Sequence, residues 1–71
     1  MSKNNAVWIS NPIFYTALYR KKGSRKFYLC GYRSIDLESL QSMVYSDVRN
    51  GICAVARIIR QDTGDVIEEV M

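Results

Sequence analysis

The chain has 71 residues, with ten lysines and arginines, seven acidic residues, no histidine and two cysteines. A chain of this length forms one domain at most and buries only about 60% of its unfolded surface, which disfavours a deep catalytic cleft or an enclosed cofactor site. A hydrophobic fraction of 48% with 24% charged residues is typical of a folded domain and excludes a disordered chain.

The charge is unevenly divided along the chain. Residues 1–35 carry seven basic side chains and no acid, whereas residues 36–71 carry three arginines and seven acids. The net charge of +3 therefore combines a basic first half with an acidic second half. This division predicts a dipolar surface and an anionic partner for the first half, unless the two halves interdigitate in the fold and their fields partly cancel.

The first half predicts a β-hairpin over residues 13–33. Residues 1–5 are expected to fray, and residues 6–10 to form a short strand that Asn11-Pro12 ends, since proline cannot donate a ladder hydrogen bond. Residues 13–20 and 26–33 are rich in aromatic and β-branched side chains, which favour strands. Gly23-Ser24 lies between them and suits a type II′ turn, whose first loop position needs a positive φ.

The middle of the chain predicts a helix over residues 35–49. Apolar residues recur there at helical spacing, namely Leu37, Leu40, Val44 and Val48. Ser34 or Asp36 can cap the start of the helix, and Asn50-Gly51 marks its end.

Residues 52–70 predict a second hairpin. Its turn, residues 62–65, contains Gly64 for the left-handed position, and a loop over 62–64 places Arg57 opposite Glu69 and Ile59 opposite Ile67. The two aspartates of this turn could hold a cation loosely, although turn formation accounts for them better.

These elements predict a fold of the α+β class. Residues 1–71 are expected to form a single small domain in the order β-hairpin, helix, β-hairpin. One antiparallel sheet would carry the helix on one of its faces.

The register of the first hairpin predicts which residues share a face. With the turn at Gly23-Ser24, Tyr19 faces Tyr28, Ala17 faces Cys30 and Tyr15 faces Tyr32, and Lys21 and Lys26 continue this face to the tip. The other face carries Phe14, Leu18, Phe27 and Leu29. We expect the helix to pack on the second face, because that face has no hydroxyl groups that need partners.

The tyrosine face would then be an exposed ladder that ends in a basic tip. Tyrosine combines a large apolar area with a polar end and is enriched in binding hot spots. The predicted partner-binding residues are Tyr15, Tyr19, Tyr28, Tyr32, Lys21, Lys22, Arg25 and Lys26. Two purely structural roles are also compatible with this pattern: the tyrosine pairs can simply stabilise the sheet, and residues 6–9, with Val7 and Trp8, can cover this face.

The sequence offers little for catalysis. Without histidine there is no histidine acid–base pair and no Ser-His or Cys-His nucleophile, and the four glycines form no phosphate-binding pattern. Cys30 and Cys53 lack the spacing of a zinc site and are expected to be buried thiols rather than a disulfide. We therefore expect no enzyme, no metal site and no cofactor.

The expected location is the cytoplasm of the cell that expresses the protein. The N-terminus lacks a basic-then-apolar leader, and no apolar run approaches the roughly 18 residues that cross a bilayer. These features predict a soluble protein with no membrane contact.

Two families share features with the chain. The segment Phe14-Tyr15-Thr16-Ala17-Leu18-Tyr19, the strand through Phe27 and residues 34–40 resemble small phage-encoded host-takeover proteins, over about residues 13–60. Members of that class, which include inhibitors of host RNA polymerase and anti-CRISPR proteins, are short α+β folds that occupy the surface of a host enzyme. The segment from Tyr19 to Phe27 before a helix is similar to AP2-like and integrase arm-binding domains, whose sheet lies in the major groove of DNA.

We therefore expect a non-enzymatic interaction module, a phage or mobile-element protein that binds and inhibits a host macromolecule through its first hairpin. The expected partner is another protein with an acidic surface, which the basic tip would attract. The alternative is a nucleic-acid-binding module whose tyrosines stack on bases, ranked second because the net charge of +3 is modest. Self-association through open edge strands is a third hypothesis.

Overall fold

The computed structural model describes residues 12–71, which form one sheet and one helix. Strands β1 (Tyr15–Arg20), β2 (Phe27–Ser34), β3 (Val55–Arg60) and β4 (Val66–Val70) are antiparallel neighbours in the order β2-β1-β3-β4, and helix α2 (Leu37–Arg49) joins β2 to β3. The predicted α+β class is confirmed. The strand expected over residues 6–10, and the cover by Val7 and Trp8, lie outside the described residues.

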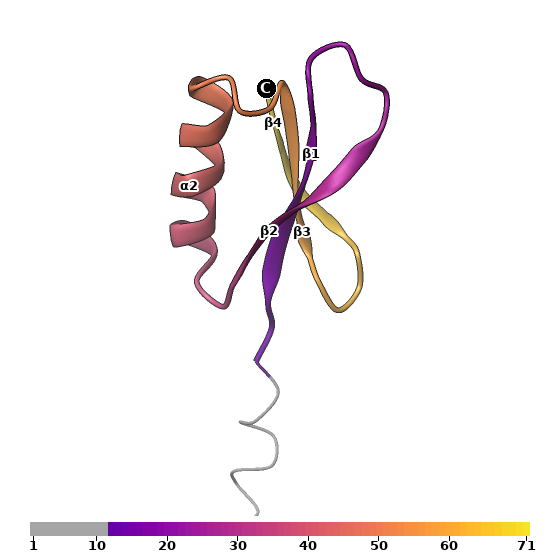
Figure 1. Ribbon diagram of the computed structural model, residues 1–71. Coiled ribbons are helices and arrows are strands. Elements are labelled where there is room, and N and C mark those ends of the chain that lie inside the picture. The colour runs from indigo at the N-terminus through magenta and orange to yellow at the C-terminus, as the bar shows by residue number, and fades with distance from the viewer. Residues whose placement is uncertain (1–11) are drawn as a thin grey trace, which may run out of the picture.

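Strand β1 is the centre of the architecture. It pairs with β2 on one side and with β3 on the other, so β2 and β3 run in the same direction with β1 between them. Helix α2 crosses over β1 to connect them and lies along one side of the sheet (Figure 1). The β1–β2 and β3–β4 turns consequently lie at opposite ends of the sheet, as Figure 1 shows.

The register of the first hairpin is as predicted near its tip. Tyr19 pairs with Tyr28, and Arg20 with Phe27. The turn itself differs from the prediction, because the Ser24 amide donates to the Lys21 carbonyl at 3.0 Å and Gly23, at φ 82°, takes the third position of the turn rather than the first loop position of a type II′ turn. The expected pairing of Lys21 with Lys26 is absent, since the ladder ends before these two like charges would face each other.

Away from the tip, β2 contains a bulge. Leu18 pairs with Leu29 and Thr16 with Arg33, so one residue of β1, Ala17, lies opposite three residues of β2, 30–32. Gly31 has a φ of 90° at this point, a conformation that suits glycine. The prediction that Tyr15 faces Tyr32 is therefore wrong: Tyr15 pairs with Ser34.

The helix begins one residue after its cap. The Asp36 Oδ1 accepts hydrogen bonds from the Glu38 and Ser39 amides at 3.1 and 3.4 Å, and its Oδ2 accepts one from the Ser39 hydroxyl at 2.9 Å. These bonds, the Ser39 hydroxyl first, hold the pKa of Asp36 below its ordinary value. Asp36 is therefore the N-cap, and the helix ends at Arg49 before Gly51, whose φ is 78°.

The second hairpin confirms one predicted pair and corrects the other. Arg57 faces Glu69, with its Nε 2.8 Å from Glu69 Oε2. Ile59 faces Val66 rather than Ile67, because the pairing shifts by one residue between Ile58 and Ile59. A single-residue shift of this kind is what a β-bulge produces.

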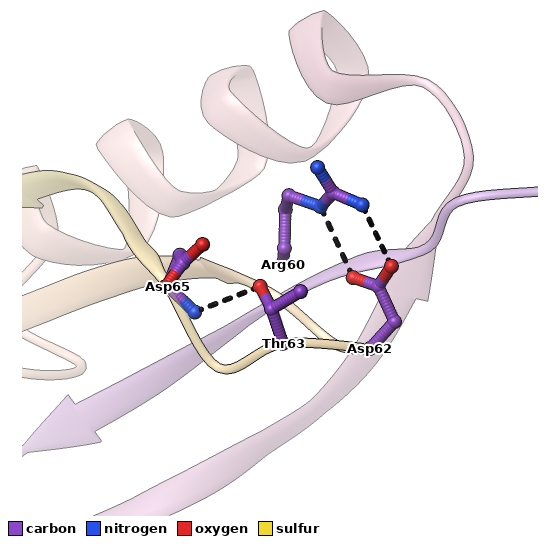
Figure 2. Close-up of polar contacts among 4 residues, drawn as sticks. All are labelled: Arg60, Asp62, Thr63 and Asp65. Carbon is purple, nitrogen blue, oxygen red and sulfur yellow. Dashed lines mark hydrogen bonds and ion pairs between the residues drawn. The ribbon is translucent and has the colours of Figure 1, made fainter.

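The β3–β4 turn uses its acids for its own structure, as Figure 2 shows. Arg60 donates from Nε and Nη2 to the two carboxylate oxygens of Asp62, at 3.1 and 2.7 Å, and this pairing lowers the pKa of Asp62. The Asp65 amide donates to the Thr63 hydroxyl at 3.2 Å. The Asp62 carboxylate is therefore paired within the turn, whereas Asp65 contributes to the turn through its backbone amide.

Helix α2 covers the tyrosine face of the sheet, not the face that carries Leu18 and Leu29. The buried core consists of Ala17, Tyr19, Leu40, Val44, Cys53, Ala56 and Ile58. The expectation that the helix packs on the face of Phe14, Leu18, Phe27 and Leu29 is thus wrong. Ala17 and Ala56 on the covered face are fully buried, and the Tyr19 hydroxyl has a hydrogen-bond partner on the helix.

That partner is Asp47. Tyr19 is only 2% exposed, and its hydroxyl donates to Asp47 Oδ2 at 2.6 Å. Burial first, and then the neighbouring carboxylate, raise the pKa of Tyr19 far above its ordinary value, so the hydroxyl stays protonated and donates at all physiological pH values. A second bridge holds β4 to the helix, since the side chains of Gln41 and Tyr45 donate to Glu68.

Replacing Tyr19 by Phe removes this hydrogen bond and leaves the ring in place. We expect Tyr19→Phe to lower the free energy of unfolding by about 1–3 kcal/mol, because Asp47 loses its buried donor. Urea unfolding followed by circular dichroism measures the change. The matched control is Tyr32→Phe, at an exposed side chain, which should stay within about 0.5 kcal/mol of the wild type. Equal stabilities of the two variants would contradict the assigned face.

Replacing Asp36 by Asn keeps a capping oxygen but removes the titrating charge. Since the folded-state pKa of Asp36 is lowered, its charge stabilises the fold fully above the ordinary carboxyl pKa of about 4 and loses this effect as the pH falls through the lowered value. The wild type should therefore be the more stable protein at neutral pH, and its advantage over Asp36→Asn should shrink below about pH 4. Unfolding curves at pH 2.5 to 7 test this; an advantage that grows on acidification would refute the cap.

Candidate functional site

The sheet has a second face, which α2 does not cover. Figure 1 shows α2 on one side of the sheet and no described element on the other. We call this surface the open face; strand register places on it Thr16, Leu18, Arg20, Phe27, Leu29, Arg33, Val55, Arg57, Ile59, Val66 and Glu69. Across its middle, one row runs through all four strands, from Leu29 through Leu18 and Arg57 to Glu69.

Most apolar side chains on the open face reach solvent, with Val55, at 7% exposure, the exception. Leu29 is 64% exposed and Val66 57% exposed, and Leu18, Phe27 and Ile59 are half-buried. Single exposed apolar residues are ordinary, but a group of them on one uncovered face is typical of an interaction surface.

The arginines of the open face are held in place by neighbours. The Arg57 guanidinium lies 4.3 Å from the centroid of the Phe27 ring and donates from Nε to Glu69. Arg33 lies 4.5 Å from the ring of Phe14 in the same way. These aromatic rings are therefore each stacked against a cation, which orders the arginines and occupies one face of each ring.

Next to the open face, the β1–β2 turn forms a basic tip, made of Lys21, Lys22, Arg25 and Lys26. All four are exposed. Among residues 12–71 the ion pairs are those of Arg57 with Glu69 and Arg60 with Asp62, so none of the four tip cations is paired there. Arg20 supports the turn by donating from Nη1 to the Ser24 carbonyl at 2.8 Å. The tip is thus a fixed loop with unneutralised charge.

Two shallow hollows lie along β2. The first, of about 310 Å³, is at the tip and is lined by Lys21, Ser24, Lys26, Phe27 and Tyr28. The second, of about 380 Å³, lies beside the bulge and is lined by Thr16, Leu29, Gly31, Tyr32, Arg33, Ile59 and Gln61. Both are open to solvent, and each combines apolar walls with a cationic side chain.

The four predicted tyrosines do not form one surface. Tyr19 is in the core and Tyr15 packs half-buried against it, whereas Tyr28 and Tyr32 are 40% and 47% exposed. Tyr28 lies beside the tip, since the Nζ of Lys21 is 5.9 Å from the centroid of the Tyr28 ring. The exposed parts of the predicted site are therefore Tyr28, Tyr32 and the basic tip.

Sequence reasoning missed the open face as a site. The Arg57–Glu69 pair was expected, but only as a stabilising contact. The pair lies on the same face as Leu18 and Leu29 only because β1 and β3 are neighbours, and the sequence pattern did not indicate that strand order.

The charges are separated along the strands. The basic tip follows the Arg20 end of β1, whereas Asp36, Asp62 and Asp65 lie at the other end, near Tyr15 and Arg60. Arg60 neutralises Asp62 at that end, and Arg33 lies in the same part of the sheet, so the charge separation comes mainly from the basic tip.

Within residues 12–71, no three His, Cys, Asp or Glu side chains gather as metal ligands would. Cys30 and Cys53 are free thiols, and burial raises the pKa of Cys53, which makes its thiolate scarce.

Helix α2 has thirteen residues, and across the part of the chain described here no helix is long and apolar enough to span a membrane.

Comparison with known proteins returns no match: no family model, no curated protein and no solved structure corresponds to the chain. The geometry of the open face and the basic tip is therefore the basis for assigning a function.

The bulge at Gly31 shapes the second hollow, and it should be sensitive to side chains that resist a positive φ. A Cβ at this position would meet no atom within 4 Å, so any cost comes from the backbone conformation alone. We expect Gly31→Val to lower the free energy of unfolding by about 1–2 kcal/mol, and Gly31→Asn, which tolerates positive φ, to lower it by less. Urea titrations measure the free energy of unfolding of both variants. Equal losses for the valine and asparagine variants would argue against a positive φ at the bulge.

Proposed function

We propose that the protein is a non-enzymatic interaction module that docks on an acidic surface of another protein through its β1–β2 hairpin. The observation that carries the proposal is the basic tip, with four exposed cations that have no acidic partner among residues 12–71. Like charges gathered on a turn cost some stability. An acidic partner surface would offset that cost.

The tip is suited to the first step of recognition. Charges at the end of a hairpin project from the molecule and act at long range, so they raise the association rate with an oppositely charged surface. The acids at the opposite end of the sheet orient the protein in such a field. Contact area would then come from Tyr28 and from the apolar side chains near it.

A protein partner is favoured over nucleic acid by what the exposed surface contains. Binding of single strands requires aromatic faces on which bases stack. Here Tyr19 is buried and the Phe27 and Phe14 rings already stack against arginines, so that among the aromatic side chains of the first hairpin only Tyr28 and Tyr32, at 40% and 47% exposure, offer a free face. The most exposed apolar groups of the open face are aliphatic, Leu29 and Val66. Apolar groups beside arginines are typical of the centres of protein interfaces.

Nucleic acid is the second candidate because of the hollow at the tip. Its lining combines Phe27 and Tyr28 with two lysines, which could hold a base and its phosphates. Crosslinking from a residue beside the tip, followed by nuclease treatment of the adduct, distinguishes a protein partner from a nucleic-acid partner.

The proposal includes inhibition of the partner. The resemblance to small phage-encoded inhibitors supports this part. Such proteins need no reactive group, because they block a host enzyme by covering its surface, and an exposed basic hairpin with adjacent apolar residues suits that mode of action.

Photocrosslinking tests the hairpin as the docking element. Azidophenylalanine replaces Tyr28, which lines the hollow at the tip, or, as the matched control, the exposed Tyr45 on α2. In extract of the expressing cell, we expect the Tyr28 probe to capture a defined protein, less efficiently as salt is added, and the Tyr45 probe not to capture it. The Lys21/Lys22/Arg25/Lys26→Ala variant should lose the adduct while keeping its circular dichroism spectrum.

Three outcomes would contradict the proposal. Equal capture by both probes, or capture that the alanine variant retains, would mean that the tip is not the docking element. An adduct that nuclease removes would establish nucleic acid as the partner.

A further inference from the structure

We infer that the open face is a second contact surface, which receives an acidic amphipathic helix of the partner with Arg57 as its anchor. The inference rests on the proposed function in that the partner is the same protein. It goes beyond that function by assigning the residues that hold the partner after the tip has attracted it.

Arg57 is prepared for a carboxylate. It lies on an inner strand, in the middle row of the open face between Leu18 and Glu69. Its Nε is bound to Glu69 and its plane rests on the Phe27 ring, so the side chain is ordered before a partner arrives. Within residues 12–71 no hydrogen bond involves its terminal amino groups, which leaves them for an incoming carboxylate.

Apolar side chains surround this anchor. Leu18 is the immediate neighbour of Arg57 on β1, and Leu29 extends the same row to the edge of the sheet. Ile59 and Val66 form the next row, beside the hollow that the Gly31 bulge opens. An ordered arginine among partly exposed aliphatic groups is the arrangement expected of an interface hot spot.

The charge of the open face favours an acidic occupant. It carries three arginines, at positions 20, 33 and 57, and a single acid, Glu69, which is already paired. The basic tip adjoins it at the Arg20 end. A segment with carboxylates beside its apolar side chains would therefore be attracted, whereas a basic segment would be repelled.

The covered face of the same sheet shows how a helix meets these requirements. There α2 presents an apolar stripe, including Leu40 and Val44, and one carboxylate, Asp47, that accepts from Tyr19 of β1. A partner helix on the open face would place its own stripe on Leu18, Leu29 and Ile59, and a carboxylate on Arg57. The sheet would then lie between two helices, an arrangement that buries both of its faces.

The test uses the full chain and a synthetic probe. The probe is a 16-residue helical peptide with leucines at positions i, i+3, i+4 and i+7 and glutamates on the flanks; the matched control peptide has lysines in place of the glutamates. Nuclear magnetic resonance titration of the labelled protein follows each residue. We expect the glutamate peptide to shift the signals of Leu18, Leu29, Arg57 and Ile59, to leave the α2 signals in place, and to bind more tightly than the lysine peptide.

Two variants measure the anchor. Arg57→Met keeps most of the apolar contact and removes the charge, and we expect it to weaken binding of the glutamate peptide about tenfold, the order expected for loss of a charge-assisted hydrogen bond. Arg49→Met, at an exposed arginine in the last turn of α2, is the control and should change the affinity less than twofold.

The outcomes separate this inference from the proposed function. If the alanine variant of the tip loses the partner adduct but still shifts its open-face signals with the glutamate peptide, both stand. If the tip result holds but Arg57→Met binds the peptide as the wild type does, the inference fails alone. If Arg57→Met weakens peptide binding but the tip captures no protein, the proposed function fails.

A different occupant of the open face would also overturn the inference. A dimer in sedimentation that Leu29→Ser converts to a monomer would assign the face to a second copy of the chain. Open-face signals of the free protein that move on Trp8→Ala would assign it to residues 1–11. Equal binding of the two peptides, or no binding of either at millimolar concentration, would show that charge does not select the occupant.

Discussion

The hydrogen bond from Tyr19 to Asp47 is the interaction on which the rest of the structure depends. It allows a tyrosine near the end of β1 to lie in the core with Leu40 and Val44, because the hydroxyl that burial would otherwise leave without water has a carboxylate partner. Side chains alternate along a strand. Once Tyr19 faces α2, Leu18 must face away from it, together with its neighbours Leu29 and Arg57. The identity of the buried face therefore determines that of the open face.

Local patterns in the sequence predicted the elements well. The helix followed from the spacing of Leu37, Leu40, Val44 and Val48, and the pairing of Tyr19 with Tyr28 from Gly23 in the turn. The choice of face was wrong, because it treated tyrosine hydroxyls as a cost without a partner, and the partner lies 28 residues further along the chain. The face that a crossover helix covers also depends on strand order, which no local pattern encodes. The bulge at Gly31 was missed for a similar reason: a glycine within a strand can serve several roles, and the neighbouring strand decides which.

The exposed surface has two parts suited to different steps of binding: the basic tip to attracting a partner and the open face to holding it. The basic tip carries charge that the described part of the chain does not neutralise, and the open face beside it carries aliphatic groups around an arginine fixed by Glu69 and Phe27. A small domain has a high ratio of surface to volume, so it can offer a large share of its surface to a partner. Packing α2 on one side of a four-stranded sheet makes this possible, because the core forms on that side and no other element of residues 12–71 covers the opposite side.

The central claim is that the Leu18 and Leu29 face of the sheet is open while the Tyr19 face is covered. Broadening of methyl signals by a soluble gadolinium chelate measures this in the free protein, because the effect falls steeply with distance from solvent. We expect strong broadening at Leu29 and Val66 and protection at Leu40, Val44 and Ile58. If Leu29 and Val66 are as protected as Leu40, the face is covered in the free protein and the central claim is contradicted.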